Sequence, residues 1–165
     1  MSGENRGYTL IEIVVVVASV GMIMTAVVGM VLGTFRAQNR TESNNKVTEN
    51  GSWIMNELRK NVFNSYAEDT VCSGDGLSVE IKSLVDGQIT TLSCDKFTNK
   101  IASVSATKTS LLNSDEVEVV DCTDFAVCES NGDKVSGVVF NFTLEATTKG
   151  IGSTQAFTTK VTLRN

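Results

Sequence analysis

The residue types that carry most enzyme chemistry are sparse in this chain. It has 165 residues, no His, no Pro and four Cys. Without His, a Ser-His-Asp or Cys-His relay is excluded, and a zinc site would need Cys or carboxylate ligands alone. The sequence contains no phosphate-binding loop, paired catalytic carboxylates or activated nucleophile. It therefore predicts that the protein is not an enzyme and binds no cofactor.

One carboxylate stands out by its position. Glu12 directly precedes a run of 23 uncharged residues, from Ile13 to Phe35. A helix of that length spans roughly 34 Å, which covers a hydrocarbon core of roughly 30 Å. The run is longer than the apolar region of a signal peptide, and no small-residue cleavage site closes it. A charge beside a membrane segment is a functional candidate, although an isolated Glu could simply mark the interface.

The residues around Glu12 carry a family resemblance. Arg6-Gly7-Tyr8-Thr9-Leu10-Ile11-Glu12 resembles the cleavage and methylation motif of type IV prepilins and of type II secretion pseudopilins. The resemblance implies that a prepilin peptidase cuts between Gly7 and Tyr8 on the cytoplasmic side and methylates the new amine. It also implies that Glu12 is used in filament assembly. Tyr8 stands where Phe is usual, and the helix-kinking Pro of many major pilins is absent.

The role that the resemblance gives Glu12 has a physical basis. After cleavage Tyr8 carries a cationic amine, and a carboxylate in a low-dielectric layer needs a positive partner. The amine of a neighbouring subunit can supply it. The partners implied are therefore other pilin or pseudopilin subunits, the prepilin peptidase, an inner-membrane assembly platform and membrane lipid. Because the net charge is −5, no specific nucleic-acid contact is expected.

The polar stretch after Phe35 continues the helix. It contains no Pro, and Val47, Gly51, Ile54, Leu58 and Val62 recur at helical spacing. Trp53, Met55 and Phe63 are expected to widen this apolar face. The pattern predicts one helix from about Thr9 to Asn64, whose C-terminal half packs on a globular domain.

A period of two follows from about Tyr66. Alternation and turn residues predict strands at 77–83, 88–94, 101–105, 116–121, 135–144 and 156–163, with turns at Val85-Asp86-Gly87, Asn131-Gly132-Asp133 and Lys149–Gly152. The amphipathic helix is the available cover for such a sheet. The predicted fold is α+β: a long N-terminal helical spine packed on a small antiparallel sheet, as in pilins. We divide the chain into a leader (residues 1–7), a transmembrane and assembly segment (8–35), an amphipathic segment (36–64) and an extracytoplasmic head (65–165).

The cysteines are expected to form disulfides in the head. Cys72, Cys94, Cys122 and Cys128 allow three pairings, and their spacing contains no C-x-x-C. We favour Cys72–Cys94 and Cys122–Cys128, the alternative being that some are free buried thiols.

An acidic cluster is the remaining candidate site. Its members are Asp115, Glu116, Glu118, Asp121 and Asp124. The resemblance makes a calcium site conceivable, but the spacing fits no calcium loop. A solvated charged edge is favoured.

Two classes of function follow. The first is a structural subunit of a type IV pilus-like filament or a secretion pseudopilus, leaning toward a minor pilin or pseudopilin. The alternative is a single-pass membrane-anchored extracytoplasmic binding protein with no filament role. The distribution of Lys and Arg opposes a cytoplasmic leader. The processing motif and the cysteines favour a cytoplasmic leader and an extracytoplasmic head. The expected final location is a cell-surface or periplasmic filament.

Overall fold

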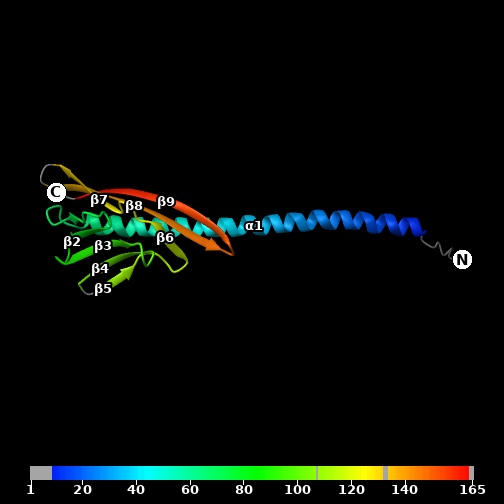
Figure 1. The fold of residues 1–165 in the computed structure, drawn as a ribbon, viewed down its shortest axis with the longest axis horizontal. Helices are drawn as coiled ribbons and strands as arrows, with labels where there is room; N and C mark the ends of the chain where they lie inside the picture. Colours follow the sequence, from blue (N-terminus) through cyan, green and yellow to red (C-terminus); the bar gives the residue numbers. More distant parts are fainter. Residues whose placement is uncertain (1–8, 107, 132–133, 164–165) are drawn as a thin grey trace. The chain divides into compact units, whose positions relative to one another are not determined.

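The computed structural model describes residues 9–106, 108–131 and 134–163 (Figure 1). The chain divides into two compact units, one ending at Asn39 and one beginning at Arg40. A single helix, α1 (Leu10–Phe63), contributes to both units and is followed by strands in the second unit. The strands are β1 (Val71–Cys72), β2 (Ser78–Lys82), β3 (Ile89–Asp95), β4 (Lys100–Ser105), β5 (Lys108–Leu111), β6 (Val117–Asp121), β7 (Ala126–Asn131), β8 (Lys134–Thr148) and β9 (Ile151–Thr162).

The predicted helix is confirmed to within one residue at each end. In the second unit α1 buries a single stripe, and every position predicted for it is buried. The stripe consists of Ser43, Val47, Gly51, Ile54, Leu58 and Val62. The prediction that Trp53 and Phe63 widen this face is wrong, since their side chains are 49% and 52% exposed. Both positions fall on the side of the helix away from the stripe, whereas Met55 does pack against the core.

The first part of the head is a five-stranded antiparallel sheet. Its strand order, β1-β2-β3-β4-β5, is the order of the chain, so each strand pairs with the next. Alternate residues point inward, as the period of two predicted, and Val79, Ile81, Leu92 and Ile101 are buried.

The second sheet is built around β8. β9 pairs with β8 without a register shift from Gly137↔Thr162 to Thr148↔Ile151, while β6 and β7 pair with separate parts of β8. Because a strand has two edges, β9 occupies one edge of β8, and β6 and β7 both pair along the other edge. The β8–β9 turn consists of Lys149 and Gly150, with φ values of 50° and 79°. Two residues with positive φ are typical of a tight hairpin turn that matches the twist of its strands.

The head thus contains two sheets where the sequence predicted one. In Figure 1 the four-stranded sheet lies along one flank of the C-terminal half of α1, and the five-stranded sheet lies along the other. Both contribute to one hydrophobic cluster with the buried stripe of the helix. The prediction of a single sheet was wrong because strand order depends on pairing between distant segments, which local alternation does not encode.

Candidate functional site

The N-terminal end of α1 places Glu12 in a defined local geometry. The backbone N–H of Glu12 donates to the carbonyl oxygen of Thr9 at 3.1 Å and lies 3.4 Å from its hydroxyl Oγ1. The residues Thr9-Leu10-Ile11-Glu12 match the pattern of a capping box, in which Ser or Thr caps the helix and Glu stands three residues later. The sequence reasoning missed Thr9, although the T-x-x-E spacing was a usable signal. Gly7 and Tyr8, the predicted cleavage and methylation residues, lie outside the described residues.

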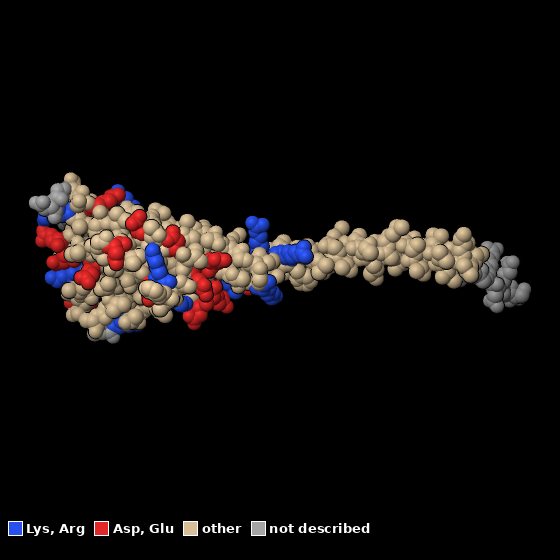
Figure 2. Space-filling view, in the orientation of Figure 1, with Lys and Arg blue, Asp and Glu red and all other residues tan. Residues whose placement is uncertain are grey.

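The helix beyond this cap has a surface unlike that of a soluble protein. All side chains from Leu10 to Phe35 are exposed, and Glu12 is the one charged residue among them. The three hydroxyl groups of the run are satisfied within the helix, because Ser19, Thr25 and Thr34 donate to carbonyl oxygens of the preceding turn at 2.8–2.9 Å. This segment of α1 is long and apolar enough to cross a membrane. On the face drawn in Figure 2, the stretch between the blue side chains and the grey residues is tan, with no Lys, Arg, Asp or Glu atoms in view.

Glu12 makes no ion pair with another described residue. It borders a shallow hollow lined by Ile13, Val16 and Val17. The carboxylate therefore lies on an apolar surface, where a low-dielectric neighbour would strengthen its attraction to any cation.

The four cysteines form two disulfides, but the predicted pairing is wrong. Cys72 pairs with Cys128 and Cys94 with Cys122, with Cα–Cα distances of 5.8 and 6.1 Å. The first bridge joins β1 to β7, and the second joins β3 to the residue after β6. Each bridge therefore connects the five-stranded sheet to the four-stranded sheet. The favoured pairing assumed that cysteines close in sequence lie close in space, and the two-sheet arrangement separates them.

The acidic cluster does not act as one site. Glu116 pairs with Lys46 at 3.1 Å and Asp115 with Lys100 at 3.0 Å. Asp121 instead accepts the backbone N–H of Thr123 at 2.9 Å. Among the described residues, no group of three His, Cys, Asp or Glu side chains could hold a metal ion.

Asp121 belongs to a set of four aspartates that hold turns at the ends of strands. Each accepts a hydrogen bond from the backbone N–H two residues later, at 2.8–3.1 Å. We call Asp75, Asp86, Asp95 and Asp121 the turn aspartates. Hydrogen bonds to the ionised form hold the pKa of each carboxyl below its ordinary value, mainly through Ser73 for Asp75, Ser83 for Asp86, the Phe97 N–H for Asp95 and Thr123 for Asp121. These carboxylates are structural.

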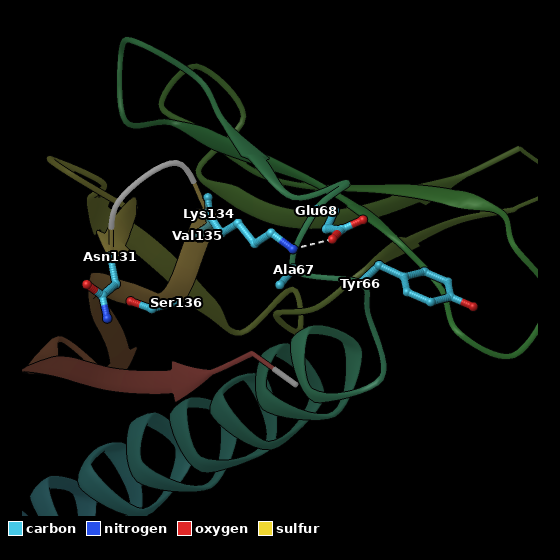
Figure 3. Close-up of a pocket in the computed structure, with 7 residues that line it drawn as sticks. All are labelled: Tyr66, Ala67, Glu68, Asn131, Lys134, Val135 and Ser136. Carbon is cyan, nitrogen blue, oxygen red and sulfur yellow. Dashed lines mark hydrogen bonds and ion pairs between the residues drawn. The ribbon is translucent and has the colours of Figure 1, made fainter. Parts of the chain in front are cut away.

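A polar hollow of about 500 Å³ lies beside the β7–β8 hairpin (Figure 3). Lys134 reaches across it to form an ion pair with Glu68, and the ring of Tyr66 points away from that pair. The hydroxyl of Ser136 donates to the carbonyl oxygen of Glu129 at 3.1 Å. The lining offers an exposed ion pair and a hydroxyl already engaged with the backbone, so it pairs no nucleophile with a base.

Comparison of the chain with protein-family models, curated proteins and solved structures gave no significant match. The class of protein therefore rests on its own geometry. The fold is α+β and pilin-like: one long N-terminal helix packs on antiparallel sheets. The same helix carries a segment, near the N-terminus, that could span a membrane.

Proposed function

We propose that this chain is a structural subunit, a minor pilin or pseudopilin, of a type IV pilus-like filament or a type II secretion pseudopilus. The observation that carries the proposal is the first part of α1, where every side chain from Leu10 to Phe35 is exposed and Glu12 is the one charge. An apolar surface of this extent is stable only against lipid or against other apolar helices. A filament subunit uses both environments in turn, first the bilayer and then the helices of its neighbours.

Glu12 gives this helix a means of selecting its neighbours. Between apolar helices the carboxylate needs a cation, since an unpaired buried charge costs several kcal/mol or shifts its pKa. The amine created on Tyr8 by cleavage after Gly7 would supply that cation from an adjacent subunit. The cap at Thr9 supports this role, because it fixes the first turn and with it the position of Glu12 on the helix.

The head supports an extracytoplasmic location. Its two sheets are joined by two disulfides, and disulfides persist in oxidising compartments such as the periplasm and the cell surface. The proposed topology therefore has a cytoplasmic leader, one membrane span and an external head.

Mass spectrometry of the native N-terminus tests the proposal. We expect a chain that begins at a methylated Tyr8, and an intact Met1 on the membrane-bound protein would contradict processing. That outcome would favour the alternative of a membrane-anchored binding protein.

A variant separates processing from assembly. Glu12→Ala should be cleaved normally but fail to enter sheared filaments or an overproduced pseudopilus. Glu49→Ala, which removes an exposed carboxylate from the second unit's part of the same helix, is the matched control and should assemble. Normal incorporation of Glu12→Ala would refute the role of Glu12.

A further inference from the structure

The outer edge of β9 is a long row of free main-chain groups. The N–H of Leu163 donates to the carbonyl oxygen of Ser136, so odd-numbered residues of β9 bond to β8. Antiparallel pairs alternate between bonded and non-bonded, and the even-numbered residues must therefore point their N–H and C=O groups away from β8. These residues are Gly152, Thr154, Ala156, Thr158, Lys160 and Thr162, and all six are exposed. Within the described part of the chain, no backbone group bonds to this edge.

This edge has few of the features that normally protect a sheet from pairing. Natural edge strands are kept short, interrupted by Pro or a bulge, or charged. β9 has 12 residues, no Pro and no register shift against β8, and its one charged residue is Lys160. By contrast, the edge strands of the other sheet have two and four residues, β1 and β5, and β5 begins with Lys108.

We propose that β9 is a homotypic interaction surface, on which β9 of a second copy pairs antiparallel to it. The strand is self-complementary in the register centred on Phe157, which overlaps all of residues 152–162. In this register Gly152 faces Thr162, Thr154 faces Lys160, and Ala156 faces Thr158 of the other copy. The one charge thus faces a neutral Thr, and no like charges oppose each other.

Main-chain bonding and symmetry both favour a second copy as the occupant. Each copy contributes six N–H donors and six carbonyl acceptors in matching positions, and the two edges need no distortion because neither is bulged. A two-fold pair in which one surface patch meets its own copy is the commonest arrangement of homo-oligomers. Thr and other β-branched residues also suit the pleated surface that the pairing would extend.

The proposed contact differs from assembly through α1. An antiparallel β9 pair joins two heads that run in opposite directions, whereas neighbours within one filament share a direction. The contact would therefore link heads of separate filaments or of separate membranes. It uses neither Glu12 nor the cleavage at Gly7, so it can hold or fail independently of the proposed function.

Cysteine cross-linking of the full chain in detergent tests the register. The four native cysteines are paired with one another, so an added cysteine is the only free thiol. Bonded antiparallel residues have Cα atoms about 5.5 Å apart, within the range of about 4.4–6.8 Å that a disulfide spans. We expect Ala156→Cys and Thr158→Cys to cross-link when the two variants are mixed and oxidised, and neither variant to cross-link alone. Cross-linking of either variant with itself would overturn the register.

A charge variant tests the contact itself. Ala156→Lys with Thr158→Lys sets lysines directly opposite lysines in the proposed pair. The matched control, Thr109→Lys with Leu111→Lys, adds the same charge to exposed positions on the edge strand β5. By sedimentation in detergent we expect a concentration-dependent dimer for wild type and control, and at least a tenfold weaker one for the β9 variant. A wild type that stays monomeric at the highest soluble concentration would overturn the proposal, as would a dimer that the β9 lysines leave unchanged.

Discussion

Gly51 of α1 lies in close contact with Phe157 of the four-stranded sheet. A Cβ atom built on Gly51 would lie 2.1 Å from Cζ of Phe157 and 2.3 and 2.5 Å from the adjoining ring carbons. The tip of the ring therefore points directly at the helix backbone. Ordinary contact begins at 3.4 Å, so Gly51→Ala requires the ring or the helix to move by about 1.3 Å.

The ring has little room to retreat. Phe157 is buried and stacks on Phe142, with ring centroids 5.4 Å apart and planes 18° from parallel. Overpacking a close-packed core costs up to about 3 kcal/mol, whereas Ala in place of Gly favours the helix by about 1 kcal/mol. We therefore expect Gly51→Ala to lower the free energy of unfolding by about 2 kcal/mol.

Denaturant unfolding of the full chain in detergent measures this difference. Trp53 is the single Trp, lies two residues from the substitution and is half-exposed, so its fluorescence reports the packing of this part of α1. Phe157→Leu removes the tip of the ring and costs about 1 kcal/mol by itself. In that background Gly51→Ala should raise the free energy of unfolding by about 1 kcal/mol through helix propensity, which gives a coupling energy of about 3 kcal/mol. A Gly51→Ala protein more stable than wild type by about 1 kcal/mol would show helix propensity alone and would refute the close contact.

Three further predictions concern the head. Non-reducing peptide mapping should recover the Cys72–Cys128 and Cys94–Cys122 links, and replacing either pair by Ser should lower the free energy of unfolding by about 4 kcal/mol, from the entropy of closing loops of these lengths. Thr148 has a buried hydroxyl without a hydrogen-bond partner among the described residues, so Thr148→Val should raise the free energy of unfolding by about 1 kcal/mol in the same denaturant assay. The turn aspartates have lowered pKa values in the folded state, so their stabilising effect is present above the unfolded value of 3.8 and is lost as pH falls through the folded values. Asp95→Asn, which keeps an acceptor oxygen for the Phe97 N–H, should make the fall in Tm below pH 4 less steep, and an unchanged pH profile would contradict this assignment.

The helix could be predicted from the sequence because its signals are local. Helical spacing of apolar residues named Val47, Gly51, Ile54, Leu58 and Val62, and all five are buried. The stretch contains no Pro that would break the helix, so its C-terminal end was predicted where the helical period gives way to a period of two. Trp53 was predicted to widen the apolar face, but its angular position on the helix, rather than its apolarity, decides which way it faces.

The strands were predicted where apolar residues alternate in the sequence and missed where they do not. β7 and the short β5 carry mixed polar sequences, because pairing in the sheet rather than a buried face holds them in place. β8 continues past its predicted end at Leu144, and β9 begins before its predicted start at Ala156. The added residues show no regular apolar alternation in the sequence. There the arms are held by continuous pairing with each other up to the turn at Lys149–Gly150.

The disulfide pairing, like the two-sheet arrangement, depends on contacts between segments that are distant in the sequence, so local patterns could not predict it. Cys94 lies in β3 of the five-stranded sheet and Cys122 directly follows β6 of the four-stranded sheet, and both belong to the hydrophobic cluster that the two sheets form with α1. Spacing along the chain favours short loops, whereas the folded head selects the pairs whose strands are adjacent. The candidate assembly site, by contrast, depends on local contacts. Thr9 and Glu12 interact within one helical turn, so the cap could have been predicted from the sequence alone.

The two parts of α1 are stabilised by different physics, and this difference bears on function. From Arg40 onward the helix is held by a buried stripe that packs on two sheets, and polar residues fill most of its exposed face. The earlier part contains Val14, Val15, Val16 and Val17 in succession, all exposed, although β-branched residues are weak helix formers in water. Such a segment forms a helix where the backbone must satisfy its own hydrogen bonds, as in a bilayer or among other apolar helices. A peptide of residues 8–35 should therefore be helical by circular dichroism in lipid vesicles and should aggregate in buffer. A soluble monomeric helix in buffer would remove the physical reason for assembly through this segment.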